Sequence, residues 1–283
     1  MKIDHVELYG KSTIQHGLFN DRVYLMNLDR DDFPHVIAHI GSLVALNGYS
    51  KAFVKVPEFA RDLFEEYGYR VEATIPGLYN GKDDGHFMAR YFHAHRLIDH
   101  SADIVQQVLV AAREKATDSQ TVKLPQACEC RLAKPSDCTE VAQLYATVFK
   151  TYPFPIHDPD YLHETMDDNV IYAGIWKQDQ LLAIASAEVD SKSGNAELTD
   201  FATLPDWRGH GLANVLLNKL EDEMASAGIK TCYTIARATS FGMNICFARN
   251  GYGFCGTLTK NTQISGGLES MNVWFKRMRG GQT

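Results

Sequence analysis

The sequence predicts an α+β protein made of two halves with a similar order of elements. Strand-like segments, several of them paired as hairpins, are interspersed with amphipathic helical segments in both halves. The motif F-x-x-x-G-Y occurs at residues 64–69 and 247–252, which indicates a degenerate internal repeat unless so short a match arises by chance. A polar stretch over 117–130 without sustained periodicity indicates a linker. We therefore expect domains at 1–125 and 126–283.

The composition of the 283-residue chain is that of a globular protein. Hydrophobic residues make up 45% and charged residues 22%, which is enough apolar material for a packed core. The net charge of −7 argues against a non-specific grip on nucleic acid or on an anionic membrane. No apolar run reaches the roughly 18 residues of a transmembrane helix, and residues 1–5 lack the apolar core of a signal peptide. We expect a cytoplasmic protein without nucleic-acid or membrane partners.

Cysteine and histidine spacing predicts no metal site. The six cysteines are scattered, and the lone close pair, Cys128 with Cys130, is not a C-x-x-C motif, so reduced structural thiols are expected. Two histidine pairs have a spacing that permits metal binding, namely His35 with His39 and His93 with His95. Neither has an adjoining carboxylate pattern, so we expect surface histidines or hydrogen-bonded core histidines.

The first half is predicted to alternate strands with helices. Val36, Ile40 and Val44 recur at helical spacing, whereas the neighbouring apolar runs are short and strand-like. The predicted strands are 23–28, 52–56, 69–75 and 86–92, and the predicted helices are 36–44 and 57–67.

The second half begins with a helix that Ser136 is predicted to cap, with apolar residues at helical spacing as far as Phe149. Three prolines within 152–159 favour extended backbone there. A hairpin, a strand, an amphipathic helix closed by Gly228, and a strand and short helix before a final strand pair then follow. Their predicted ranges are 170–176 with 181–189, 196–204, 212 onward, 231–236, 243–249, and 254–258 with 271–277.

The most informative segment is a glycine-containing turn that opens a helix. A strand ends at Pro205, and Arg208-x-x-Gly211-x-Ala213 then begins the helix. Gly209 and Gly211 allow the backbone to approach a ligand closely, and the unpaired N–H groups of a helix start suit a pyrophosphate. The alternative is a simple turn before a core helix. A P-loop is absent, and a dinucleotide fingerprint lacks its third glycine.

In these motifs the chain resembles the GNAT superfamily of acetyl-CoA-dependent N-acetyltransferases over residues 130–278. The resemblance is carried by Arg131-Leu132-Ala133-x-x-x-Asp137, the 205–213 turn, Asn244 and the Arg-Asn-Gly-Tyr ending at 249–252. It implies a mixed, mostly antiparallel central sheet flanked by helices, preceded by a diverged GNAT-like half. Within the superfamily the chain looks most like the beta-lysine N-acetyltransferases, on the basis of the proline-rich segment 152–161.

The resemblance implies acetyl-CoA as co-substrate and assigns residues to it. The backbone of the turn would hold the pyrophosphate, the strand edge before it would pair with the pantetheine amides, and Asn244 would contact the pantetheine arm or a catalytic water. The implied set is Phe201, Ala202, Thr203, Arg208, Gly209, His210, Gly211, Leu212, Ala213, Asn214 and Asn244.

Acetylation of an amine calls for a base. A lysine-type amine has a pKa of about 10.4, so neutralising it at pH 7 costs about 4.6 kcal/mol. The resemblance implies Glu197 as general base with Asp200 in reserve, unless Glu197 is merely a solvent-facing strand carboxylate. Phe247 stands where many members place an acidic tyrosine, so Tyr252, Tyr233 or water protonates the thiolate, or no acid is needed.

The proline-rich segment lies where the superfamily places its acceptor-site wall. Asp158 suits an ammonium group, and His157 or an arginine suits a carboxylate. A stiff packing loop is the alternative. The expected acceptor-binding set is Tyr152, Phe154, His157, Asp158 and Asp200.

These expectations converge on acetyl transfer to a small free amine. The resemblance implies the N6-amine of beta-lysine and a compatible-solute product. Lysine, a polyamine or another amino acid are alternative acceptors, and a protein amine is a less favoured one. A CoA-sensing module without turnover is the alternative of another class, which Phe247 leaves open.

The first half lacks the glycine turn. At the corresponding strand–helix join it carries Asp29, Asp31 and Asp32, which would repel a pyrophosphate. We therefore predict that this half binds no CoA and acts as a scaffold or acceptor-pocket wall. Because it can take the place of a second subunit, both a monomer and a homodimer are possible.

Overall fold

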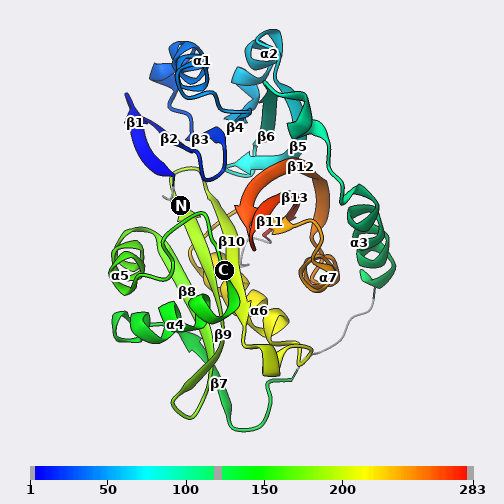
Figure 1. Ribbon diagram of the computed structural model, residues 1–283. Coiled ribbons are helices and arrows are strands. Elements are labelled where there is room, and N and C mark those ends of the chain that lie inside the picture. The colour runs from blue at the N-terminus through cyan, green and yellow to red at the C-terminus, as the bar shows by residue number, and fades with distance from the viewer. Residues whose placement is uncertain (1–3, 118–122, 279–283) are drawn as a thin grey trace.

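The computed structural model describes residues 4–117 and 123–278. Residues 118–122 of the predicted linker therefore lie outside the described residues. So do residues 1–3, part of the segment in which no signal peptide was predicted. Within the described part, 13 strands form one mixed sheet, and helices flank it (Figure 1). This arrangement confirms the predicted α+β class. No described helix is both long enough and apolar enough to span a bilayer.

The first half contains six strands and three α-helices among its described residues. They are β1 (His5–Tyr9), β2 (Ser12–Gly17), β3 (Arg22–Asn27), α1 (His35–Asn47), β4 (Lys51–Pro57), α2 (Glu58–Glu66), β5 (Arg70–Tyr79), β6 (Asp83–Tyr91) and α3 (Ala102–Lys115).

The second half supplies the other seven strands. Its elements are β7 (Cys128–Leu132), α4 (Cys138–Val148), α5 (Pro159–Asp168), β8 (Val170–Lys177), β9 (Gln180–Asp190), β10 (Asn195–Thr203), α6 (Leu212–Ser226), β11 (Thr231–Arg237), α7 (Phe241–Arg249), β12 (Gly253–Ile264) and β13 (Gly267–Arg277).

The two halves share one strand order. The sheet runs β1-β2-β3-β4-β6-β5 and then β12-β13-β11-β10-β9-β8-β7, so the second half repeats the order of the first in reverse and adds β7. Each half has one parallel pair, β3 with β4 and β10 with β11, connected through α1 and α6 respectively. The halves meet where Gly256 of β12 pairs with Ala73 of β5.

Both copies of F-x-x-x-G-Y end a helix in the same way. The Phe64 and Tyr69 rings pack edge-to-face with centroids 5.0 Å apart, and those of Phe247 and Tyr252 do so at 5.2 Å. In each copy the tyrosine N–H donates to the phenylalanine carbonyl at 3.1 Å. The intervening glycines have φ of 82° and 81°, a left-handed conformation that favours glycine.

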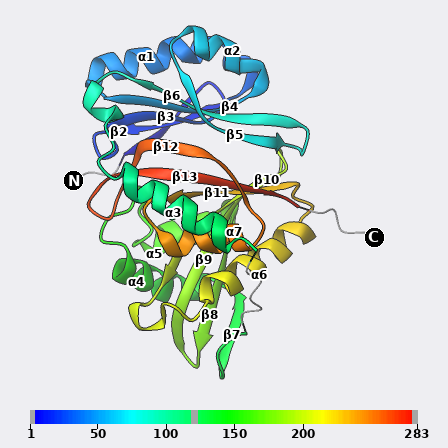
Figure 2. The same ribbon diagram turned by 90° about the vertical axis from the view of Figure 1, so that its right-hand side faces the viewer.

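The half-sheets face each other across an apolar layer. Tyr24, Phe53 and Phe87 of the first half pack against Tyr233 and Val273 of the second. Figure 2 shows the two half-sheets one above the other, with α1 and α2 covering the outer face of the first. In the second half, α4 and α5 cover one sheet face, while α6 and α7 cover the opposite face.

Three buried cations of the first half anchor it to β12. Arg22 Nη1, Lys51 Nζ and Arg96 Nε donate to the carbonyls of residues 261, 259 and 260 at 2.5, 2.9 and 2.8 Å. These carbonyls lie where the β12–β13 register shifts, so strand pairing leaves them available. Charge-assisted hydrogen bonds therefore fix the first half to β12 of the second half.

Five of the described helices and strands were not predicted: the two strands of the β1–β2 hairpin, α3 and β7 on either side of the linker, and α5 after the proline-rich segment. The prediction that Ser136 caps α4 is wrong, because a 3₁₀ turn over Pro135–Asp137 precedes the helix and Asp137 is its N-cap residue. The proline-rich segment is non-helical as far as Asp158, whose side chain then caps α5 by accepting from the Asp160 N–H at 3.0 Å.

Candidate active site

A pocket of about 570 Å³ lies where β10 and β11 separate. The two parallel strands pair along residues 195–197 and 231–233, and beyond that β10 stays with β9 while β11 stays with β13. The pocket is lined by the far ends of both strands, the turn before α6, and α7. The separation exposes one edge of β10, which leaves backbone amides for an extended ligand to pair with.

A bulge in β10 accompanies the separation. The β9–β10 register shifts between Thr199 and Ala202, and Asp200 adopts a φ of 54°. Its carboxylate accepts hydrogen bonds from Ser186 Oγ at 2.6 Å and from the Tyr152 hydroxyl. Burial raises the pKa of Asp200, and these hydrogen bonds oppose the rise. The bulge thus holds a carboxyl group in the pocket wall.

The turn before α6 presents its backbone amides to the pocket. Gly209 and Gly211 have φ of 82° and 74°, and no side chain caps the helix. Among the described residues, no acceptor takes the N–H groups of residues 209–213. A Cβ added at Gly209 would meet nothing within 4 Å, so the approach to these amides is open. Such a helix start attracts an anion through its donors and its dipole.

Most residues predicted to bind the cofactor lie together at this pocket. Its lining includes Phe201, Thr203, Arg208, Gly209, Gly211, Leu212, Ala213 and Asn214. The exposed His210 is outside the lining; its Nδ1 lies 3.2 Å from the Arg208 carbonyl oxygen, and its ring lies 5.6 Å from the Trp207 ring, centroid to centroid. Ala202 packs its side chain into the core under α4, so its backbone alone is available to a ligand.

Asn244 does not reach the pocket. Its side chain is fully buried and donates to the carbonyls of Arg237 and Ser240 at 3.0 and 2.7 Å. Its oxygen accepts from Asn272 and Trp274, both at 2.9 Å. All four hydrogen-bonding positions of the amide are therefore used to tie α7 to β13, so we remove Asn244 from the cofactor set.

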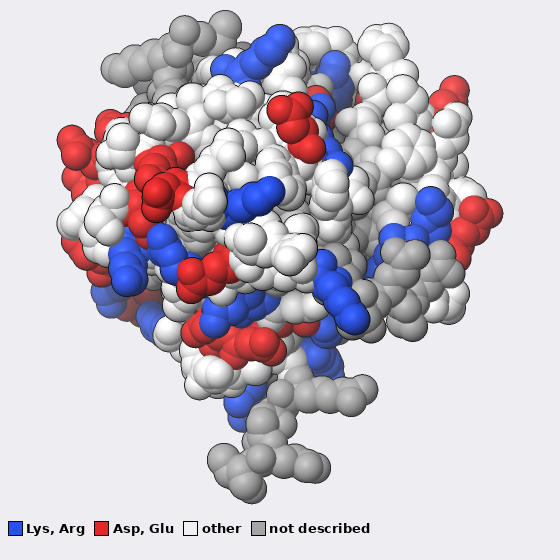
Figure 3. Space-filling model, turned by 90° about the horizontal axis from the view of Figure 1, so that it is seen from below, with Lys and Arg blue, Asp and Glu red and all other residues white. Residues whose placement is uncertain are grey.

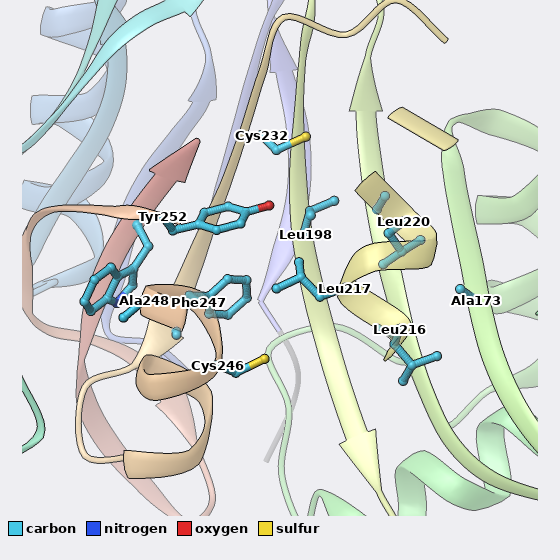
Figure 4. Close-up of a cluster of buried hydrophobic side chains, with 14 of the residues drawn as sticks. Ala173, Leu198, Leu216, Leu217, Leu220, Cys232, Cys246, Phe247, Ala248 and Tyr252 are labelled. Carbon is cyan, nitrogen blue, oxygen red and sulfur yellow. The ribbon is translucent and has the colours of Figure 1, made fainter. Parts of the chain in front are cut away.

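Tyr252 also lies in the core. Figure 4 shows its ring beside Phe247 and its hydroxyl directed toward Cys232 and Leu198. The residue is 4% exposed and is outside the pocket lining, and burial raises the pKa of its hydroxyl well above the ordinary value. A buried phenol this far from the pocket is a poor proton donor to a leaving thiolate, so we do not carry Tyr252 into the proposal.

Phe247 and Cys246 lie next to each other at the pocket wall. Phe247 is 1% exposed and packs edge-to-face on Phe201 with ring centroids 5.5 Å apart. The Cys246 thiol lies 3.3 Å from the Asn214 side-chain oxygen, and burial raises its pKa to about 12. The thiol stays protonated at neutral pH, as expected for a structural cysteine.

Two glutamates face each other next to Asp200. Glu197 of β10 and Glu188 of β9 are directly paired across the strands, on the sheet face that α4 and α5 cover. Both side chains are half-buried. Burial raises the pKa of Glu197 to about 7, which Lys55 and a hydrogen bond from Tyr233 oppose. Burial and the facing Glu197 raise the pKa of Glu188 to about 8. The pair therefore titrates as a unit near neutral pH.

Removing the charge of Glu188 should stabilise the protein at alkaline pH. A carboxyl whose pKa is higher in the folded than in the unfolded chain stabilises the fold while protonated, and that stability is lost as pH rises through the raised pKa. Glu188→Gln should therefore raise the melting temperature by about 3 °C near pH 9 and change it little near pH 4. Scanning calorimetry of Glu188→Gln and of Glu129→Gln, at an exposed position on β7, tests this. Equal shifts at both pH values would contradict it.

The predicted acceptor residues separate into two groups. Tyr152 and Asp200 line the pocket and are hydrogen-bonded to each other. Phe154 is half-buried in the α4–α5 core, whereas His157 and Asp158 are exposed. Because Asp158 serves as the cap of α5, the structure gives it a structural role and leaves the ammonium to other carboxylates.

Three residues near the site were missed. Glu188 lacks a motif, but its pairing with Glu197 follows from the predicted hairpin and next strand. Lys55 is a lysine between two buried valines of β4, and its Nζ lies 3.4 Å from the Tyr233 hydroxyl. Lys115 at the end of α3 lines the pocket beside the turn before α6. A lone lysine within an apolar strand is the signal that points to Lys55.

One face of the molecule carries charges of both signs. On the face seen from below, described lysine, arginine, aspartate and glutamate side chains are interspersed, without a broad patch of one sign (Figure 3).

The strand–helix join of the first half differs from the turn before α6. A 3₁₀ turn over Arg30–Asp32 precedes α1, and Asp32 accepts from the N–H groups of Lys11 and Ser12, each at 2.8 Å. Within the join itself, the Asp29 carboxylate accepts from the Asp31 N–H at 3.0 Å. That the first half binds no CoA remains a prediction, and the arrangement supports it.

Comparison with known proteins places these features in context. The sequence profile of the acetyltransferase (GNAT) family matches residues 139–252. The beta-lysine N(6)-acetyltransferase of Methanococcus maripaludis is 37% identical over 265 residues, which cover 94% of this chain and 96% of that protein. N-acetyltransferase YodP of Bacillus subtilis is 34% identical over 272 residues, with coverage of 94% and 96%.

A further relative and a solved structure extend the comparison. The beta-lysine N(6)-acetyltransferase of Methanosarcina mazei is 33% identical over 266 residues, covering 87% of this chain and 98% of that protein. The ribosomal-protein-S18-alanine N-acetyltransferase of Escherichia coli superposes with a TM-score of 0.47 and 16% identity, over 55% of this chain and 98% of that one. The three relatives match along both halves of the chain.

Proposed function

The chain belongs to the GNAT family of acetyltransferases, and on that premise we propose that it transfers the acetyl group of acetyl-CoA to the N6-amine of beta-lysine. Two of the relatives carry that activity in their names. The observation that carries the proposal is a group of three carboxyls: Asp200 lines the pocket, and Glu197, at the last residue at which β10 pairs with β11, faces Glu188 just outside the pocket lining.

The acceptor site suits a small diamino acid. Glu188, Glu197 and Asp200 provide negative charge for its ammonium groups, and Tyr152 holds Asp200 in place. Lys55, on the first half, lies close enough to Glu197 and Glu188 to act on both electrostatically. A carboxylate bound by Lys55 and an amine bound by Glu197 would give beta-lysine one orientation. The first half thus forms a wall of the acceptor site.

The co-substrate is held by groups already present. The N–H groups of residues 209–213 bind the pyrophosphate, and the open edge of β10 pairs with the pantetheine amides. Acetyl-CoA supplies an activated acyl group whose thiolate is a good leaving group.

Glu197 supplies the base. It takes a proton from the acceptor ammonium, so the neutral amine forms the N–C bond as the C–S bond breaks. A base with a pKa near 7 is ionised in about half of the molecules at neutral pH, and its ionised form is basic enough to accept the proton of the ammonium. A β10 backbone N–H stabilises the carbonyl oxygen, and water passes the second proton of the attacking nitrogen to the departing thiolate because Phe247 offers no hydroxyl, while Glu197 returns its proton to solvent. The direct route predicts sequential rather than ping-pong kinetics.

A panel of amines with labelled acetyl-CoA tests the acceptor. Beta-lysine should give the highest kcat/KM, ahead of lysine and spermidine. Lys55→Met should raise the KM for beta-lysine by about 10-fold or more. It should leave unchanged the KM for a diamine that differs from beta-lysine only in lacking the carboxyl group. Equal effects on both substrates would remove Lys55 from carboxylate recognition.

Failure to acetylate any free amine would favour a CoA-sensing module without turnover, for which Phe247 is the specific support. A preference for lysine or spermidine would keep the chemistry and replace the acceptor. That the product acts as a compatible solute, that the protein is cytoplasmic, and the domain boundary near 125 stay predictions.

A further inference from the structure

A cluster of histidine and glutamate side chains lies at the edge of the first half, outside the acetyl-transfer site. His5 and Glu7 project from one face of β1, and His16 of β2 is paired directly with His5. His39 of α1 reaches the same carboxylate from above the sheet. Figure 1 shows α1 above the β1–β2 hairpin. Three segments of the chain thus meet at Glu7.

His5, Glu7 and His16 are spaced as the ligands of a metal site are, whereas His39 lies outside this group of three and contacts Glu7 alone among them. Nε2 of His5 lies 3.8 Å from Glu7 Oε2, and Nε2 of His16 and of His39 lie 3.5 and 3.4 Å from Glu7 Oε1. One ligand atom from each of His5, Glu7 and His16 lies within 4.8 Å of the other two. Ligands at 2.0–2.1 Å around tetrahedral zinc are about 3.3 Å apart. A small contraction would bring these atoms to that separation.

His16 provides an independent observation. Its side chain is 7% exposed, its Nδ1 lies 3.0 Å from the buried Tyr49 hydroxyl, and its Nε2 makes no hydrogen bond to the described residues, with Glu7 Oε1 at the ion-pair distance of 3.5 Å. Buried polar nitrogens are rarely left unpartnered, and an ion is one explanation for those that are. A metal-bound imidazole characteristically engages its second nitrogen in a hydrogen bond, which is the role that Tyr49 would have here.

The cluster is open to solvent on the side of His5 and His39. The side chains of His5 and His39 are 58% and 31% exposed, so an ion can enter from solvent.

We propose that His5, Glu7 and His16 bind a divalent transition metal ion, zinc by ligand preference, and that His39, which contacts Glu7, turns toward the ion as the fourth ligand. Imidazole nitrogens with one carboxylate oxygen are a ligand set that zinc favours. The expectation of no metal site came from spacing within single segments, whereas these ligands come from two strands and a helix. The ion would tie the edge hairpin β1–β2 to α1.

Zinc binding to the untagged full-length chain tests the proposal. After treatment with a chelator, titration with zinc chloride should show one ion per chain and a higher melting temperature. His5→Ala and His39→Ala remove exposed side chains and should each weaken zinc binding by about 10- to 100-fold. His35→Ala, an exposed position one turn earlier on α1, is the matched control and should bind like the unchanged chain.

Cobalt(II) provides a second readout, because a tetrahedral site gives intense visible absorption that His16→Gln should abolish. Binding of less than one ion per chain, or equal losses in His35→Ala and His5→Ala, would overturn the proposal. These readouts do not involve acetyl transfer, so they are independent of the proposed function.

Discussion

Replacing Glu197 with glutamine is expected to lower kcat by about 100-fold or more near pH 7, the usual contribution of a positioned base. The amide keeps the size of the carboxyl but cannot accept the amine's proton. The unchanged enzyme should gain activity as pH rises through the raised pKa of the Glu188–Glu197 pair. Without the base, activity should follow the fraction of neutral amine and rise toward more alkaline pH. Initial rates across pH with saturating acetyl-CoA measure both effects.

Asp200→Asn is the matched comparison, because Asp200 is the reserve base and lies on the same sheet face. It removes a carboxyl bonded to Ser186 and Tyr152 and should raise the KM for the amine more than it changes the pH profile. An unaltered pH profile in Glu197→Gln would remove Glu197 from the role. If Asp200→Asn, and not Glu197→Gln, removed the fall in activity at acidic pH, the base would be Asp200.

A negative charge at Gly209 is expected to weaken coenzyme binding by about 10-fold or more relative to an uncharged side chain of equal size. Gly209 has a φ of 82°, which aspartate and asparagine tolerate better than most residues, and a Cβ there points into open space. Gly209→Asp and Gly209→Asn therefore share any backbone strain and differ in charge. The carboxylate would repel the pyrophosphate from the amides of the turn.

Calorimetric titration with CoA at low and high salt separates charge from shape. The difference between the two variants should shrink as salt increases, because screening weakens the repulsion. Equal dissociation constants for the two variants at low salt would mean that no phosphate lies near Gly209.

The sequence predicted the elements whose periodicity is local. The β8–β9 hairpin, the helix α6 and the short helix α7 were placed within a few residues because their apolar spacing and glycine ends are read from one segment. The turn before α6 was found for the same reason, since two glycines and a helix start are adjacent in the chain.

Features that depend on distant partners were missed or misassigned. Asn244 has a polar side chain in a family motif, but its four hydrogen bonds within the fold use its whole capacity. Lys55 reaches the Tyr233 hydroxyl of the second half because the half-sheets face each other. No single segment of the sequence encodes that contact. Polar strands such as β1, with His5 and Glu7 on one face, lack the apolar alternation that identifies a strand.

The central claim is that the backbone amides of the turn before α6 bind the diphosphate of the coenzyme. A crystal structure of the chain with acetyl-CoA tests it most directly. The account predicts phosphate oxygens within hydrogen-bonding distance of the N–H groups of residues 209–213, and the pantetheine arm along the free edge of β10 with the acetyl group facing Glu197. Coenzyme bound elsewhere while this turn stays empty would contradict the account.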